Sequence, residues 1–131
     1  MEPKDITILL VEDDKFLVDI FATRLKSAGY NVIVANDGES GLQIATERHP
    51  HLILLDIIMP QMDGYEVLAK LQEQDMTKGI PVILLTNLGH EEDVEKGLKS
   101  GAAGYLIKAQ YTPTEVLNKV KEILERYNST L

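Results

Sequence analysis

Short apolar runs alternate with stretches of helical periodicity along most of the chain. Between the runs, apolar residues recur at spacings of three and four, which is typical of amphipathic helices. We expect buried strands over 6–11, 31–35, 52–56, 81–86 and 104–107, and helices over about 17–28, 39–48, from 64, over 91–100 and after 112. Five such repeats, joined by right-handed crossovers, predict an α/β fold with a parallel sheet between two layers of helices.

Residues at the expected helix ends support this division. Gly29 offers a C-terminal stop for the first helix, and Pro50 disfavours a longer second helix. Thr112 is a favourable N-cap for the last helix, with Pro113 at the first helical position and Glu115 placed for a capping box. The last helix is therefore expected to be well defined at its start.

The expected helix over 91–100 is the least stable element of the pattern. Its apolar face offers little more than Val94 and Leu98 for burial. Gly97 within it lowers helix stability by about 1 kcal/mol relative to Ala. We expect this helix to depend strongly on its contacts with the rest of the fold.

Composition limits the classes of protein that fit. The 131 residues predict one globular domain over 1–131, and the absence of Cys excludes disulfides and thiolate sites and favours a reducing cytoplasm. The net charge of -8 opposes direct binding to nucleic acids or anionic membranes. No apolar run approaches the roughly 18–20 residues of a membrane span, so we expect a soluble, cytoplasmic protein.

Three apolar runs end in residues that can hold a phosphoryl group or a metal ion. Glu12, Asp13 and Asp14 follow the first run, Asp56 the third, and Lys108 the fifth. If these runs are parallel strands, their carboxyl ends open on one edge of the sheet, where open α/β folds bind ligands. The acids and the lysine should then converge. Asp14 is expected to belong only to the helix start.

Four motifs at matching spacing resemble the receiver domain of two-component response regulators, over essentially the whole chain. They are Val11-Glu-Asp-Asp14, Asp56-Ile-Ile-Met-Pro-Gln-Met-Asp-Gly64, Leu84-Leu-Thr86 and Tyr105-Leu-Ile-Lys108. The resemblance implies a flavodoxin-like, doubly wound (βα)5 three-layer sandwich with strand order 2-1-3-4-5. It also implies a phosphorylation-dependent signalling domain of a phosphorelay and not an enzyme.

The resemblance makes Asp56 the phosphoryl acceptor. A carboxylate is a weak nucleophile toward a phosphorus atom surrounded by negative oxygens unless a divalent cation neutralises them, and magnesium suits this task. By resemblance, Asp13 is a direct magnesium ligand, Glu12 a ligand through water, and the backbone carbonyl of Ile58 a further ligand. Asp63 is expected to be a hydrogen-bond acceptor in the loop that leads to Gly64.

Three further residues complete the expected site. Lys108 would pair with Asp56 before transfer and with the phosphoryl group afterwards. Thr86 would donate its hydroxyl to the same oxygen cluster. Tyr105 is either a rotameric switch or a core residue. Receivers usually carry a proline, commonly with a cis bond, after the lysine; here Ala109 predicts a trans bond.

The resemblance also implies the kinds of partner. The phosphoryl donor would be a sensor histidine kinase or a histidine phosphotransfer protein, and the target a protein that docks on the fourth helix, fifth strand and fifth helix. His49, His51 and His90 share no metal-ligand spacing and are expected at the surface.

Three alternatives differ in class. An unphosphorylated receiver fold that only binds proteins stays open. A magnesium-dependent aspartyl phosphatase of the haloacid-dehalogenase type would need a second Asp where this chain has Ile58. A flavodoxin would need a hydroxyl- and glycine-rich phosphate loop after the first strand, where this chain has three acids.

Overall fold

The computed structural model describes residues 1–128, so the last three residues of the expected domain lie outside the described part. The strands are β1 (Thr7–Val11), β2 (Asn31–Ala35), β3 (Leu52–Leu55), β4 (Val82–Thr86) and β5 (Gly104–Ile107). The α-helices are α1 (Lys15–Ser27), α2 (Gly38–Arg48), α3 (Gly64–Glu73), α4 (Glu91–Lys99) and α5 (Pro113–Asn128). Two short 3-10 helices are η1 (Pro3–Asp5) and η2 (Lys108–Gln110).

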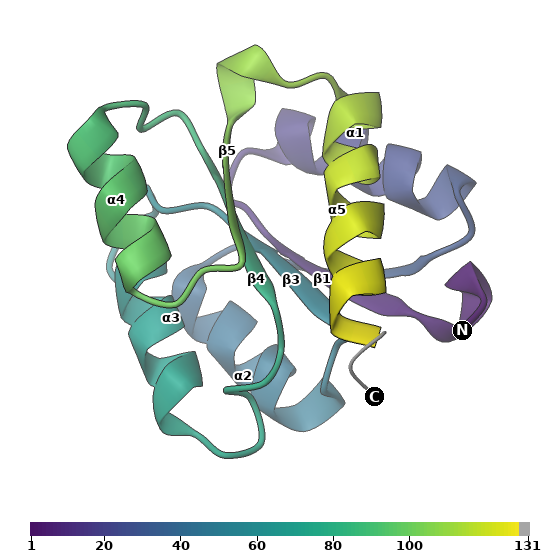
Figure 1. Cartoon of the computed structure of the whole chain (residues 1–131), viewed down its shortest axis with the longest axis horizontal. Coiled ribbons are helices and arrows are strands. Elements are labelled where there is room, and N and C mark those ends of the chain that lie inside the picture. The colour runs from purple at the N-terminus through teal and green to yellow at the C-terminus, as the bar shows by residue number, and fades with distance from the viewer. Residues whose placement is uncertain (129–131) are drawn as a thin grey trace.

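The five strands form one parallel sheet in the order β2-β1-β3-β4-β5, which confirms the expected topology. Helices α1 and α5 cover one face, and α2, α3 and α4 cover the other (Figure 1). The central strands β1, β3 and β4 are buried almost throughout, as expected of strands covered on both faces. The three-layer sandwich is therefore the architecture of this chain.

The ends of the elements differ from the expected ranges by one or two residues. Ile6 is buried but precedes β1, and Asp56 follows β3. Pro81 precedes β4, because a proline has no N–H with which to extend the ladder. Each difference lies at the boundary of a strand. The backbone hydrogen bonds of the sheet, and not the hydrophobicity of the residue, determine where a strand begins and ends.

Capping accounts for where several helices begin and end. Asp14 caps α1, where its Oδ1 accepts hydrogen bonds from the N–H groups of Phe16 (2.9 Å) and Leu17 (3.3 Å). Thr112 and Glu115 form the expected capping box of α5: each side chain accepts the other's backbone N–H. These local predictions are confirmed.

Two of the three histidines have a role in the local backbone structure. His49 ends α2 in the left-handed region, with a φ of 48°. His51 is half-buried, and its Nδ1 accepts a hydrogen bond of 3.0 Å from the N–H of Thr7. The expectation of a plain surface residue is wrong for His51, because its ring completes the backbone pairing at the start of β1.

Helix α4 differs from its expected packing. Leu98 is 48% exposed, Val94 is half-buried, and Gly97 is the buried residue of this helix. An added Cβ at Gly97 would lie 2.8 Å from both Leu84 Cδ1 and Tyr105 Cδ2. The helix therefore packs through its backbone at Gly97, and the glycine permits this close approach.

Among residues 1–128, no helix combines the length and hydropathy that a membrane crossing requires.

Candidate functional site

The carboxyl ends of β1 and β3 place two acids side by side. Val11 and Leu55 are paired in the sheet register, so the residues that follow them leave the sheet at the same level. The N–H of Asp56 donates to the carbonyl of Val11 (3.1 Å), and the N–H of Glu12 donates to the carbonyl of Ala35 (3.0 Å). Both acids are thus anchored through their backbone, directly beyond the strands.

Glu12, Asp13 and Asp56 form a carboxylate cluster. One carboxylate oxygen from each residue lies within 4.8 Å of the others. Glu12 is 1% exposed and Asp56 is 5% exposed, whereas Asp13 faces solvent. Buried carboxylates are costly unless they are paired or hold a cation, so this cluster needs positive charge beside it.

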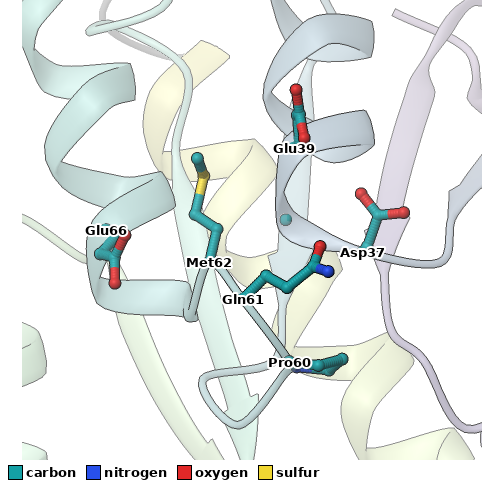
Figure 2. Close-up of a pocket in the computed structure, with 7 residues that line it drawn as sticks. Asp37, Glu39, Pro60, Gln61, Met62 and Glu66 are labelled. Atoms are coloured by element: carbon teal, nitrogen blue, oxygen red, sulfur yellow. The ribbon is translucent and has the colours of Figure 1, made fainter.

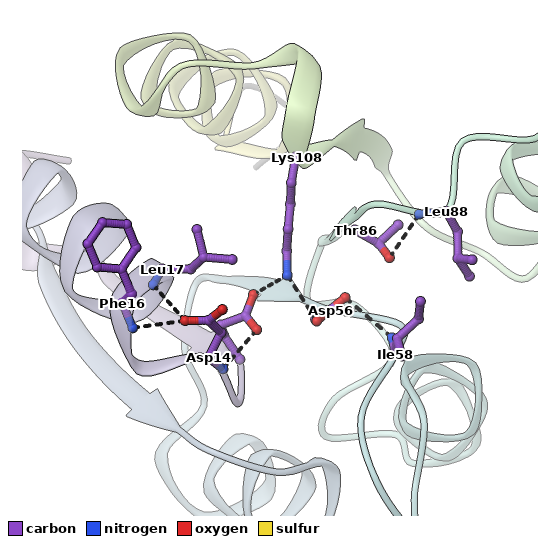
Figure 3. Close-up of polar contacts among 9 residues, drawn as sticks. Asp14, Phe16, Leu17, Asp56, Ile58, Thr86, Leu88 and Lys108 are labelled. Atoms are coloured by element: carbon purple, nitrogen blue, oxygen red, sulfur yellow. Dashed lines mark hydrogen bonds and ion pairs between the residues drawn. The ribbon is translucent and has the colours of Figure 1, made fainter.

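Lys108 supplies that charge from the end of β5. Its Nζ lies 3.0 Å from Asp56 Oδ2 and also forms an ion pair with Glu12 Oε1 (Figure 3). The Lys108 side chain is itself only 9% exposed. Pairing with Asp56 was expected from the sequence, but pairing with Glu12 was not. The structure therefore joins Glu12, Asp13, Asp56 and Lys108 at one edge of the sheet.

Burial and charge shift the titration of this cluster. Burial raises the pKa of Glu12, and the nearby Asp56 raises it further, against the opposing pair with Lys108. Burial by itself would lower the pKa of Lys108. The hydrogen bonds of Lys108 to Glu12 and Asp56 outweigh the effect of burial, so the pKa of Lys108 is raised. Lys108 is therefore a firmly protonated cation shared by two buried acids.

The loop after Asp56 is tightly built. The N–H of Ile58 donates to Asp56 Oδ1 (3.3 Å), and the N–H of Gly64 donates to the carbonyl of Ile57 (2.8 Å). A Cβ at Gly64 would overlap the Asp56 carbonyl and lie 2.7 Å from Ile57 Cα, so a glycine is required there. Asp63 caps α3 by accepting the N–H of Glu66 (2.9 Å). The loop fixes one oxygen of Asp56 while Lys108 fixes the other.

Thr86 is fully buried at the end of β4, but its described hydrogen bond does not reach the carboxylate cluster. Its Oγ1 accepts the N–H of Leu88 at 3.4 Å (Figure 3). A threonine at the end of a strand commonly closes the following turn in this way. The expected donation from Thr86 to the oxygen cluster is therefore not present in this arrangement.

Tyr105 is half-buried on β5, and its hydroxyl donates to the carbonyl of Leu88 at 2.6 Å. Burial raises the pKa of Tyr105 far above its usual range, with further contributions from Tyr65 and Asp93. Leu88 thus binds Thr86 through its N–H and Tyr105 through its carbonyl. Sequence reasoning missed this link, because it uses only the backbone of Leu88.

The peptide bond between Lys108 and Ala109, next to the site, is trans, as predicted.

A surface cavity of about 190 Å³ lies beside the loop that follows Asp56 (Figure 2). It is lined by Asp37, Gly38, Glu39, Pro60, Gln61, Met62 and Glu66. It shares no residue with the carboxylate cluster and is separate from it.

Comparisons with known proteins agree on one family. The model of the response regulator receiver domain matches residues 8–121. The chain is 39% identical over 126 residues to the probable transcriptional regulator ycf27 of Cyanophora paradoxa, covering 96% of this chain and 51% of the relative. It is 39% identical over 119 residues to the DNA-binding dual master transcriptional regulator RpaA of Synechocystis, covering 91% and 49%.

The fold is likewise shared with a solved structure. The CheY-like response regulator receiver domain protein from Methanospirillum hungatei superposes with a TM-score of 0.89 at 30% identity, covering 96% of this chain and 98% of that one. The chain spans about half the length of the curated relatives that it matches.

Proposed function

Because this chain belongs to the response regulator receiver domain family of two-component systems, we propose that it is a phosphorylation-dependent switch with Asp56 as its phosphoryl acceptor. The carrying observation is that both oxygens of the buried Asp56 carboxylate are held, Oδ2 by Lys108 and Oδ1 by the N–H of Ile58. A carboxylate fixed in this way, beside Glu12 and Asp13, is better suited to accept a phosphoryl group than to stabilise a turn or cap a helix.

Transfer would proceed from a phosphohistidine of a sensor kinase or phosphotransfer protein. An Asp56 oxygen forms a bond to phosphorus as the bond from phosphorus to the donor's histidine nitrogen breaks, and the imidazole recovers a proton from solvent. The ammonium of Lys108 offsets the negative charge that arrives on the phosphoryl oxygens. Its contact with Asp56 Oδ2 already places it beside the reacting carboxylate.

Magnesium fits the residues present. Glu12, Asp13 and Asp56 supply the hard oxygen ligands that this ion prefers, and we assign the Ile58 carbonyl as a further ligand. When bound, magnesium would neutralise charge on the phosphoryl oxygens. Asp13 is the exposed member of the cluster and hence the side chain open to the arriving ion.

Output would run through Leu88. Phosphorylation adds acceptor oxygens near Thr86, whose hydroxyl would leave the N–H of Leu88 for the phosphoryl group. The carbonyl of Leu88 holds Tyr105, so a shift of this segment frees the Tyr105 ring to turn inward. The surface formed by α4, β5 and α5 would then repack, and a target protein would read it there.

We infer that the chain signals by protein contact, in the cytoplasm, and that it does not itself bind nucleic acid. Its net charge of -8 opposes contact with phosphate backbones. The relatives named as transcriptional regulators are about twice as long as their match to this chain. In a protein of that kind, DNA binding would lie outside the receiver and would be controlled by it.

Labelling with acetyl phosphate in the presence of magnesium tests the acceptor. The wild type should become phosphorylated, and Asp56→Asn should not. Asp75→Asn is a matched control, because the Asp75 side chain is 94% exposed and pairs with the exposed Lys78. Equal labelling of Asp56→Asn and wild type would show that the acceptor is another residue. An unlabelled wild type would favour the receiver fold that only binds proteins.

Amide exchange tests the output. Beryllofluoride mimics the phosphoryl group, and with magnesium it should change protection between residues 88 and 111. Unchanged protection over that segment would contradict the route through Leu88 and Tyr105.

A further inference from the structure

Helix α4 is held by a second tyrosine in addition to Tyr105. Tyr65, the second residue of α3, donates its hydroxyl to the carbonyl of Asp93 at 3.2 Å. The ammonium of Lys96 lies 4.1 Å from the centroid of the Tyr65 ring, within the range of a cation–π contact. Tyr65 thus contacts α4 through both its hydroxyl and its ring.

The two tyrosines meet the same stripe of α4. Lys96 and Gly97 lie three and four residues after Asp93, so both lie on the same face of the helix as Asp93. Tyr65 binds at Asp93 and Lys96, while the ring of Tyr105 lies against Gly97. Since Gly97 is the buried residue of α4, these contacts form much of the attachment of the helix.

Both hydroxyls act as hydrogen-bond donors to backbone carbonyls in one continuous segment. Tyr105 donates to Leu88, before α4, and Tyr65 donates to Asp93, in its first turn. Burial raises the pKa of Tyr65 as well as that of Tyr105, so both phenols keep their protons at neutral pH. A movement of this segment would have to break both bonds.

We propose that Tyr65 is a positioning residue of the switch: it holds α4 in the resting arrangement and so opposes activation. The inference rests on the proposed function, because it concerns the change that phosphorylation of Asp56 would cause. Tyr65 directly follows Gly64, which is bonded to Ile57 in the loop leaving Asp56. The contact therefore ties α4 to the segment that carries the acceptor.

A ligand that prefers the activated arrangement binds more tightly when the resting one is weakened. Removal of the Tyr65 hydroxyl deletes one neutral hydrogen bond of the resting state. The loss of one such bond should tighten apparent beryllofluoride binding by about fivefold. A residue with a merely structural role would lower the unfolding temperature and leave this affinity unchanged.

The test compares Tyr65→Phe with wild type in two measurements. The first is amide exchange of residues 89–100 without beryllofluoride, which should become faster in the variant. The second is a beryllofluoride titration at saturating magnesium, which should show the tighter binding. Tyr30→Phe is the matched control, because Tyr30 belongs to the core cluster on the opposite face of the sheet.

The ring contact has its own pair of variants. Lys96→Met removes the cation above Tyr65 and should act in the same direction as Tyr65→Phe, with a smaller effect. Lys99→Met removes a cation of the same helix that pairs with Glu95 instead, and should leave beryllofluoride binding unchanged.

The outcomes separate the two proposals. If wild type binds beryllofluoride but Tyr65→Phe binds it with unchanged affinity, the inference about Tyr65 is overturned and the proposed function stands. Unchanged exchange over 89–100 in Tyr65→Phe overturns it as well. A wild type that does not respond to beryllofluoride contradicts the proposed function and, with it, the role of Tyr65 in a switch.

Discussion

Lys108 and Glu12 form a buried ion pair that joins the ends of β5 and β1, although β3 and β4 lie between these strands in the sheet. The same ammonium binds Asp56. One cation therefore compensates two buried acids in the protein itself.

Replacement of Lys108 should destabilise the fold and increase its response to magnesium. Lys108→Met leaves Glu12 and Asp56 buried without a counter-charge, and breaking such a pair costs about 3 kcal/mol. Magnesium bound at the proposed site would replace the lost charge, so it should raise the melting temperature more in the variant than in wild type. Thermal unfolding with and without magnesium measures both effects. Lys78→Met, which breaks an exposed pair, should change little; a similar loss there would contradict this account.

Stability should fall as the pH rises above 10, in part through Tyr105. Its pKa is raised in the folded protein, so the unfolded chain releases this proton first. The contribution of Tyr105 to the stability of the fold is therefore complete below pH 10, the ordinary pKa of tyrosine, and is lost progressively above it. Tyr105→Phe should make the decline in unfolding free energy shallower, by at most about 1.4 kcal/mol per pH unit. Denaturant unfolding between about pH 9 and pH 11.5 measures the slopes; parallel slopes would show that Tyr105 does not contribute.

Gly97→Ala should destabilise the protein even though alanine is the better helix former. The new methyl group would lie 2.8 Å from Leu84 Cδ1 and Tyr105 Cδ2. Overpacking costs about 1–3 kcal/mol and helix propensity returns about 1 kcal/mol, so we expect a net loss of about 1 kcal/mol. Gly79→Ala is the control, because a Cβ there meets no atom within 4 Å. Denaturant unfolding of both variants measures the sign of the change in unfolding free energy. A stabilised Gly97→Ala variant would show that α4 can move away from the sheet without a loss of stability.

Ile58→Asn should shorten the lifetime of the phosphorylated state. From the family resemblance we expect Ile58 and Leu88 to flank the approach of water to the phosphorus. Neither aliphatic side chain can orient a water molecule by hydrogen bonding. Ile58 is 57% exposed, so an asparagine fits without repacking the core. Phosphate release from labelled protein should become several-fold faster in Ile58→Asn and stay near wild type in Ile58→Val. An unchanged or slower rate in Ile58→Asn would mean that shielding by this side chain does not set the lifetime.

The sheet and the caps could be predicted because their causes lie close together in the sequence. Aliphatic runs such as the one ending at Val11 are buried on both faces, and Thr112 with Glu115 forms a capping box over a single turn. Strand order came from the family resemblance and not from the pattern. The convergence of Asp56 and Lys108 followed once the strands were taken as parallel.

The remaining features depend on how elements pack, which periodicity does not report. Leu98 has helical spacing suited to burial, yet it is exposed because α4 approaches the sheet through Gly97. The bond from Tyr105 to Leu88 uses a carbonyl group, which every residue has, so no sequence pattern marks it. The contact of Tyr65 with Asp93 likewise required the positions of two helices.

The narrow attachment of α4 has a consequence for how the chain can diverge. Most of this helix faces outward, and Gly97 is the one buried position among its described residues. Under the proposed docking of a target protein on α4, substitutions at the outward positions would change which partners are accepted without altering Asp56 or Lys108. Recognition and chemistry can therefore evolve separately, and duplicated copies of such a chain could acquire distinct partners while keeping the same reactive centre.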